Sequence, residues 1–151
     1  MNRLVRSALV AALAVLVLVP SVIAGGAMVT RGEIHAFATG SGLDIAGRAQ
    51  MVRTADGKTI VTVHVTGLAP NNVYGAHVHQ QACAVGAAGT HYKFNPAGSA
   101  TPPNEIWPGF TTNAAGIGNG SATVGATAGT TAVSVVIHAP GGDKIACADL
   151  R

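Results

Sequence analysis

Short runs in which apolar and polar residues alternate recur along this chain and limit the folds open to it. Residues 59–65 alternate in this way and follow Asp56-Gly57, a pair typical of hairpin turns. Further runs begin at Glu33 and cover residues 45–54, 73–79, 110–113, 121–127, 131–138 and 145–150. No stretch after residue 24 keeps the apolar period of a helix for three turns. The sequence therefore predicts an all-β sandwich or flattened barrel of about eight short strands.

The composition excludes several other classes. Charged residues make up only 10% of the chain and aromatic residues 4%. A larger charged fraction is typical of coiled coils, of charged disordered tails and of long helices stabilised by ion pairs. Basic residues do not cluster with aromatic ones, so nucleic acid is not an expected partner.

The N-terminal segment has the pattern of a secretory leader. Arg3 and Arg6 precede an apolar run over residues 8–19, and Val22 and Ala24 occupy the −3 and −1 positions of a cleavage site. The run has about 12 residues, whereas a bilayer core requires roughly 20, so a permanent anchor is the weaker alternative. We predict a signal peptide at residues 1–24 and an exported protein, periplasmic, secreted or on the cell surface, without a membrane span after cleavage.

Removal of the leader changes both the charge and the extent of the folding unit. The whole chain has 9 basic and 6 acidic side chains, and loss of Arg3 and Arg6 leaves a nearly neutral remainder of 7 and 6. We expect a short N-terminal linker at residues 25–32 and a single domain over residues 33–151.

Two cysteines, Cys83 and Cys147, lie in this domain. In an oxidising compartment they can form a disulfide, which would close a loop of about 65 residues and stabilise the fold by roughly 4 kcal/mol. Two unpaired, buried thiols are the alternative.

The alternation stops between Cys83 and Phe110, where about 26 residues are rich in Ala, Gly, Pro and Asn. Loops of this length inside a compact domain are usually functional or disordered. A bridge from Cys83 to the last strand would hold the start of this segment, which favours a functional loop.

Six histidines stand at positions 35, 64, 77, 79, 91 and 138. His77 and His79 are two residues apart on a predicted strand, so both rings point to one face of the sheet and can reach one ion. His91 lies in the irregular segment, and His138 ends the Val-rich run at residues 133–137. Taken singly, each of these residues is more often structural than a ligand.

Taken together with their flanking residues, these histidines resemble the copper/zinc superoxide dismutase family. The matching motifs occur in that family's order: Gly67-Leu68-Ala69-Pro70, Gly75-Ala76-His77-Val78-His79, Cys83, Gly89-Thr90-His91, Phe94-Asn95-Pro96, Val136-Ile137-His138 and Lys144-Ile145-Ala146-Cys147. The match covers about residues 33–149. The resemblance implies a Greek-key β-barrel, in agreement with the predicted strands, and superoxide as the substrate.

The resemblance also implies a metal site with one copper ion per chain. His77, His79, His91 and His138 match the family's four copper ligands. His91 stands where the family has the histidine that bridges copper to zinc.

Other residues are assigned by the same comparison. Cys83 and Cys147 match the family's intrachain disulfide. His35 and His64 match no ligand position, and we interpret them as ordinary strand residues.

An all-imidazole ligand set suits copper in both oxidation states, because it has no thiolate to lock the reduced ion. Copper that cycles between these states can oxidise one superoxide ion to dioxygen and reduce the next to peroxide. The reductive half needs a proton, and a histidine released from the reduced ion can deliver one. His91 is our candidate for this catalytic role.

The chain departs from the family at the zinc site. The family holds zinc with two further histidines and an aspartate, but no histidine lies between His91 and His138. A closed zinc site requires four ligands, so we expect zinc to be absent. The departure resembles the family's copper-only branch, in which a glutamate hydrogen-bonds the histidine that zinc would otherwise orient. Glu105, the only acidic residue between Asp56 and Asp143, is our candidate for this role, and an exposed loop acid is the alternative.

A second departure follows His138, where the family has a long charged loop that guides superoxide to copper. Here only residues 139–143 precede Lys144, which stands in the place of the family's active-site arginine. A lysine attracts an anion as a point charge but lacks the planar fork of arginine. We therefore predict a catalytic role for Lys144 in an open copper site with weak anion guidance and slow turnover.

Three functions compete at this level. The leading one is an exported copper-dependent superoxide dismutase. The second is a protein that stores or delivers copper with the same imidazoles and exchanges it with a copper donor, because the guiding loop and the arginine are missing. The third is a structural or adhesive β-sandwich that has lost a working site.

Overall fold

The computed structural model describes residues 26–151, in which eight strands make up nearly all of the regular structure. The strands are β1 (Met28–Ala36), β2 (Ala46–Arg53), β3 (Thr59–Thr66), β4 (Val73–His79), β5 (Phe110–Thr111), β6 (Gly118–Val124), β7 (Ser134–His138) and β8 (Lys144–Asp149). Two single-turn 3-10 helices, η1 (Ala38–Gly40) and η2 (Gly86–Ala88), are the only helical elements in this range. The predicted all-β class is confirmed.

The predicted signal peptide at residues 1–24 lies outside the described residues. Within residues 26–151, no helix is long and apolar enough to cross a membrane.

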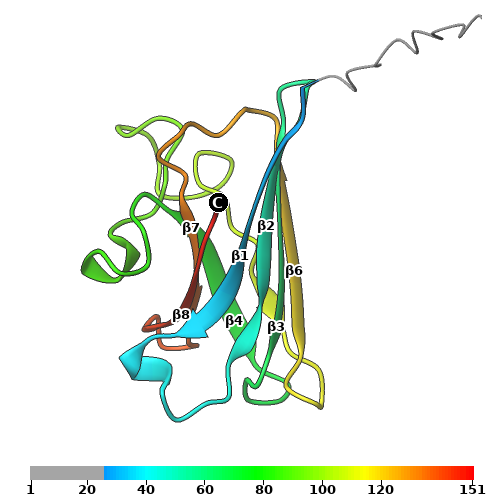
Figure 1. Cartoon of the computed structure of the whole chain (residues 1–151), viewed down its shortest axis with the longest axis vertical. Coiled ribbons are helices and arrows are strands. Elements are labelled where there is room, and N and C mark those ends of the chain that lie inside the picture. Colours follow the sequence, from blue (N-terminus) through cyan, green and yellow to red (C-terminus); the bar gives the residue numbers. More distant parts are fainter. Residues whose placement is uncertain (1–25) are drawn as a thin grey trace, which may run out of the picture.

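The strands pair in antiparallel fashion in the order β5-β4-β7-β8-β1-β2-β3-β6. A bridge between Thr112, just after β5, and Gly118, at the start of β6, links the two ends of this order, so the sheet is nearly closed into a barrel. The connections from β3 to β4 and from β6 to β7 join strands that are not neighbours, as in a Greek key. Figure 1 shows β2, β3 and β6 on one side of the barrel and β4, β7 and β8 on the other.

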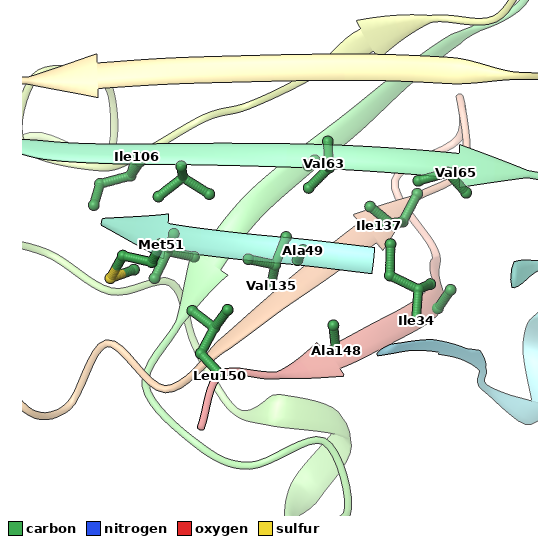
Figure 2. Packing of buried hydrophobic residues seen from close by; sticks show 14 of the residues in the cluster. Ile34, Ala49, Met51, Val63, Val65, Ile106, Val135, Ile137, Ala148 and Leu150 are labelled. Atoms are coloured by element: carbon green, nitrogen blue, oxygen red, sulfur yellow. The ribbon is translucent and has the colours of Figure 1, made fainter. Parts of the chain in front are cut away.

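The core lies between these two sides. On β3, Val63 and Val65 are buried while Thr62 is exposed, which is the alternation seen in the sequence. Figure 2 shows the two valines facing Ile137 of β7 and Ala148 of β8 across the interior. Burial of a valine or isoleucine side chain of this kind stabilises the fold by about 1.5–3 kcal/mol.

β7 is buried along its whole length because it is covered on both faces. The barrel interior covers one face, and on the other Val136 packs with Cys147 and with Ala88 of the long segment 80–109. The predicted disulfide is present and joins Cys83, near the start of that segment, to Cys147 on β8. The long loop is therefore a packed part of the barrel wall.

The first strand begins earlier than the sequence analysis placed it. Residues 28–32, expected as part of the linker 25–32, belong to β1 and pair with β2. Gly32 lies where β1 passes the backbone of Asp149, and a Cβ atom there would be 1.9 Å from the Asp149 carbonyl oxygen. Glycine is uncommon in strands, so a glycine required by close approach gives no strand signal in the sequence.

Candidate metal centre

Three of the four predicted ligands come from two neighbouring strands. Val78 lies between His77 and His79 on β4 and packs in the barrel core, so strand alternation turns both imidazoles away from the core. His138 follows the core residue Ile137 at the end of β7 and has the same orientation. Because β4 and β7 are paired, the three rings share one face of the barrel.

His91 comes from the long segment 80–109. Its backbone forms an isolated antiparallel bridge with His79. The Tyr92 amide donates to the Val78 carbonyl at 2.8 Å, so residues 91 and 92 extend the sheet beside β4. This pairing brings the His91 ring over the face that carries the other three histidines.

The four rings converge on one point. One potential ligand nitrogen from each of His77, His79, His91 and His138 lies within 4.8 Å of all the others. The ring centroid of His77 is 4.2 Å from that of His91 and 4.7 Å from that of His138. Among residues 26–151, this four-histidine cluster is the one group of His, Cys, Asp and Glu side chains close enough to hold a metal ion.

Backbone carbonyls determine which nitrogen two of these rings present. His79 Nδ1 donates to the Gly89 carbonyl at 3.3 Å, and His138 Nδ1 donates to the Gly142 carbonyl at 2.9 Å. A neutral imidazole that donates from Nδ1 keeps its lone pair on Nε2. The two Nε2 atoms face each other at 3.4 Å, and a shared cation would stabilise two such opposed acceptors.

His77 presents the other nitrogen. Its Nδ1 atom is buried and has no hydrogen-bond partner. Such an atom costs free energy unless a ligand satisfies it. His91 Nδ1 donates to Glu105 Oε2, so its Nε2 is also free. Nδ1 of His77 and Nε2 of the other three rings therefore form a donor set that fits a bound metal ion.

Burial also keeps the rings in the form that binds metals. It lowers the pKa of both His77 and His79 to about 3, and the neighbouring His91 contributes in the same direction. The pKa of His138 is lowered as well, again mainly by burial. These imidazoles are neutral near pH 7, so their lone pairs are available to a metal ion without loss of a proton.

Glu105 lies behind His91 and is only 1% exposed. Its Oε2 atom accepts a hydrogen bond from His91 Nδ1 at 2.7 Å. The contact predicted between these two side chains is present, and the alternative of an exposed loop acid is wrong.

Trp107 contacts the centre and was missed by the sequence analysis. Its Nε1 atom donates to Glu105 Oε2 at 2.8 Å. Ile106 is fully buried in the core, and its carbonyl accepts from the Val78 amide at 3.1 Å. Alternation about Ile106 therefore turns Glu105 and Trp107 to the metal side, as alternation about Val78 does for the β4 histidines. The Glu-Ile-Trp spacing was the signal that could have identified Trp107.

Lys144 lies on β8 opposite His138 in the register of the two strands. Its Nζ atom donates to the carbonyls of Ala87 at 2.8 Å and Gly89 at 2.6 Å. Lys144 and Lys93, a lysine that the sequence analysis did not single out, line a hollow of about 550 Å³ beside His91, to which Glu105 adds one buried carboxylate. This side of the centre is suited to attract an anion.

A second hollow, of about 500 Å³, reaches the cluster from another direction. Its lining includes three of the cluster histidines together with Val73, Ala139 and Pro140, and it has no Lys, Arg, Asp or Glu. The β7–β8 connection forms one wall as a tight turn, in which the Gly142 amide donates to the Ala139 carbonyl. The metal centre is therefore bordered by one cationic and one uncharged hollow.

The two remaining histidines lie outside the cluster. His64 Nδ1 is 2.8 Å from Asn119 Oδ1 on the neighbouring β6, and His35 is an exposed residue of β1.

Comparison with known proteins adds no identification: no family model and no curated protein matches the chain. Fold and geometry together define an antiparallel Greek-key barrel that holds one disulfide and a four-histidine cluster able to bind a metal ion.

Proposed function

We propose that this chain is an exported copper-dependent superoxide dismutase with one copper ion per chain and no zinc site. The observation that carries the proposal is the set of four converging imidazoles with lone pairs directed at one point. Such a set suits both Cu(II) and Cu(I). Bound copper would supply one-electron chemistry, by which two superoxide ions and two protons give dioxygen and hydrogen peroxide.

His91 is the proposed proton donor. Its side chain is 30% exposed, whereas His79 and His138 are buried. Glu105 holds the ring through Nδ1, so Nε2 is the atom that exchanges a proton at the centre. A partly exposed imidazole fixed at one nitrogen can take a proton from solvent at the other.

Lys144 is the proposed anion-attracting residue, with Lys93 beside it. Two carbonyl acceptors hold the Lys144 ammonium group at the edge of the hollow next to His91. Because a fixed positive charge raises the local concentration of anions, superoxide is expected to enter on this side.

The absence of zinc is part of the proposal. In the resembling family, the bridging histidine uses its second ring nitrogen for zinc. Here the second nitrogen of His91 donates to the Glu105 carboxylate, which supports a copper-only centre.

Copper loading followed by an activity measurement tests the proposal. Purified protein is given one equivalent of Cu(II), bound copper and zinc are quantified, and superoxide decay is followed by stopped flow with a chelator that removes free copper. We expect one copper per chain, no zinc, and catalysis that the chelator does not abolish. The variant His77→Gln should lose it, while His35→Gln, outside the cluster, should keep it. Absence of catalysis by the loaded wild type would overturn the proposal.

Copper storage or delivery remains a second candidate because of the uncharged hollow. Val73 on its rim is 67% exposed, and no charged side chain lines it. Such an opening favours transfer of copper from a donor over guidance of an anion. Stoichiometric copper without activity above that of the free ion would support this function, and no bound copper would favour a structural role.

Export to an oxidising compartment is supported by the leader pattern at residues 1–24 and by the disulfide. Fractionation of cells that produce the full chain tests it. Recovery of the uncleaved chain from the cytoplasm would contradict export.

A further inference from the structure

Trp107 contacts one metal-site histidine, His77, directly and is linked to a second, His91, through Glu105. Its indole N–H donates to Glu105 Oε2, the same oxygen atom that accepts from His91 Nδ1. Its rings pack against His77, with centroids 5.0 Å apart and an interplanar angle of 55°. The residue is 37% exposed, so it forms part of the outer wall of the centre.

The hydrogen bond to Glu105 matters because that carboxylate is buried. A buried carboxylate is stable only when donors surround it, and His91 and Trp107 supply the side-chain donors to Oε2. Since both converge on one oxygen atom, the indole fixes the position of the acceptor to which His91 is bound. Without the indole N–H, the carboxylate would be free to rotate away from the imidazole.

The ring contact matters because His77 lacks any hydrogen bond at Nδ1. Ring contacts therefore contribute to the orientation of this imidazole. The rings in contact with it are those of Trp107, His91 and His138, and Trp107 is the one among these three that is not a candidate metal ligand.

We propose that Trp107 is a positioning residue of the metal centre: its N–H fixes the Glu105 carboxylate that orients His91, and its ring holds His77 in place. The two imidazoles are then arranged before the metal arrives. This inference rests on the proposed copper site, but not on its catalytic activity.

Three variants separate the two contacts. Trp107→Phe keeps a ring over His77 and removes the N–H donor, Trp107→Leu removes both, and Glu105→Gln removes the carboxylate. Removal of such outer partners of metal ligands typically weakens metal binding by about 10–100-fold. We expect loss of Cu(II) affinity by about tenfold in Trp107→Phe and by more in Trp107→Leu, measured by competition with a chelator, together with altered copper hyperfine couplings in the EPR spectrum.

A double variant tests the route through Glu105. If the N–H acts on the carboxylate, Trp107→Phe should change Cu(II) affinity little in the Glu105→Gln background. Full additivity would overturn that part of the proposal. Val29→Ala, another partly exposed apolar residue that lies on β1, serves as the control and should keep the wild-type affinity and spectrum.

The wild-type chain provides a measurement that needs no Trp variant. It has one tryptophan, so the metal-free protein should give a single indole N–H signal in a ¹H–¹⁵N NMR spectrum. A downfield signal protected from solvent exchange, shifted by Glu105→Gln, is expected. Failure of the wild type to bind copper would overturn the proposed function, whereas wild-type affinity and EPR couplings in Trp107→Phe and Trp107→Leu would overturn only the role of Trp107.

Discussion

At the residue scale, the metal centre depends on which nitrogen each imidazole leaves free. The sequence identified the four histidines through their spacing and flanking motifs. It could not identify the free nitrogens, because Gly89 and Gly142 act through backbone carbonyls, which every residue carries. It also missed Trp107, whose hydrogen-bond partner is known only once the irregular segment is folded.

The lowered pKa values of the buried histidines predict how the metal-free protein responds to acid. In the folded chain, burial lowers the pKa of His77 and His79 to about 3, from an ordinary value of 6.5 in the unfolded chain. Below pH 6.5 the unfolded chain therefore binds more protons than the folded chain does. The stability of the folded state that depends on the two neutral imidazoles is complete above pH 6.5 and is lost as the pH falls toward 3. Urea unfolding in the presence of a metal chelator should show this decline. A constant free energy of unfolding between pH 7 and 4 would contradict it.

A charge-removing variant tests the cationic hollow. Lys144→Met removes the ammonium group beside the cluster and should weaken azide binding to the Cu(II)-loaded protein by about three- to tenfold at low ionic strength. Lys58→Met changes the net charge equally but lies in an exposed turn, paired with Asp56. It should leave the azide affinity unchanged. Equal effects of the two variants would show that net charge, rather than position, determines anion binding.

At the element scale, the accuracy of the sequence analysis followed the strength of the alternation. β3 and β4 were predicted almost to the residue, because buried positions alternate with more exposed ones along all of β3 and most of β4. β6 begins at Gly118, earlier than predicted. A Cβ atom on Gly120 of that strand would be 2.0 Å from the Pro108 carbonyl oxygen, so glycine is required there within the sheet. In the sequence the same glycine indicates a turn. Close contacts between distant segments are not encoded in local patterns.

The disulfide is predicted to stabilise both the barrel and the segment that carries His91. It closes a loop with a sequence separation of 64, which corresponds to roughly 4 kcal/mol on the chain-entropy model. The Cys83→Ser/Cys147→Ser double variant should therefore lose about that amount of stability in urea unfolding. It should also bind Cu(II) more weakly, because the segment 80–109 loses its covalent attachment to β8 and keeps only noncovalent contacts with it. Unchanged Cu(II) affinity would show that noncovalent contacts, among them the His79–His91 bridge and the Glu105 hydrogen bond, are sufficient to position the ring.

At the scale of the whole molecule, the metal centre lies across parts of the chain that are far apart in sequence. Ligands from β4, from the long segment and from β7 meet only in the folded barrel. The unfolded chain therefore holds no preformed site, and metal binding is linked to folding.

This linkage predicts a large effect of copper on stability. Free Cu(II) at about 1,000 times the dissociation constant should raise the free energy of unfolding by about 4 kcal/mol, and a chelator should reverse the gain. The effect should vanish in His138→Gln and persist in His35→Gln, since His35 lies outside the cluster. Calorimetric melts with and without Cu(II) measure it. Stabilisation of equal size in both variants would place the bound metal elsewhere.

The position of Trp107 has a practical consequence. Because the chain has one tryptophan and its rings lie against His77, its fluorescence arises next to the metal centre. Paramagnetic Cu(II) would quench this emission, whereas closed-shell Zn(II) would leave most of it. The protein thus contains its own optical reporter, and titration of the unlabelled chain with either metal can distinguish Cu(II) from Zn(II) at the four-histidine cluster.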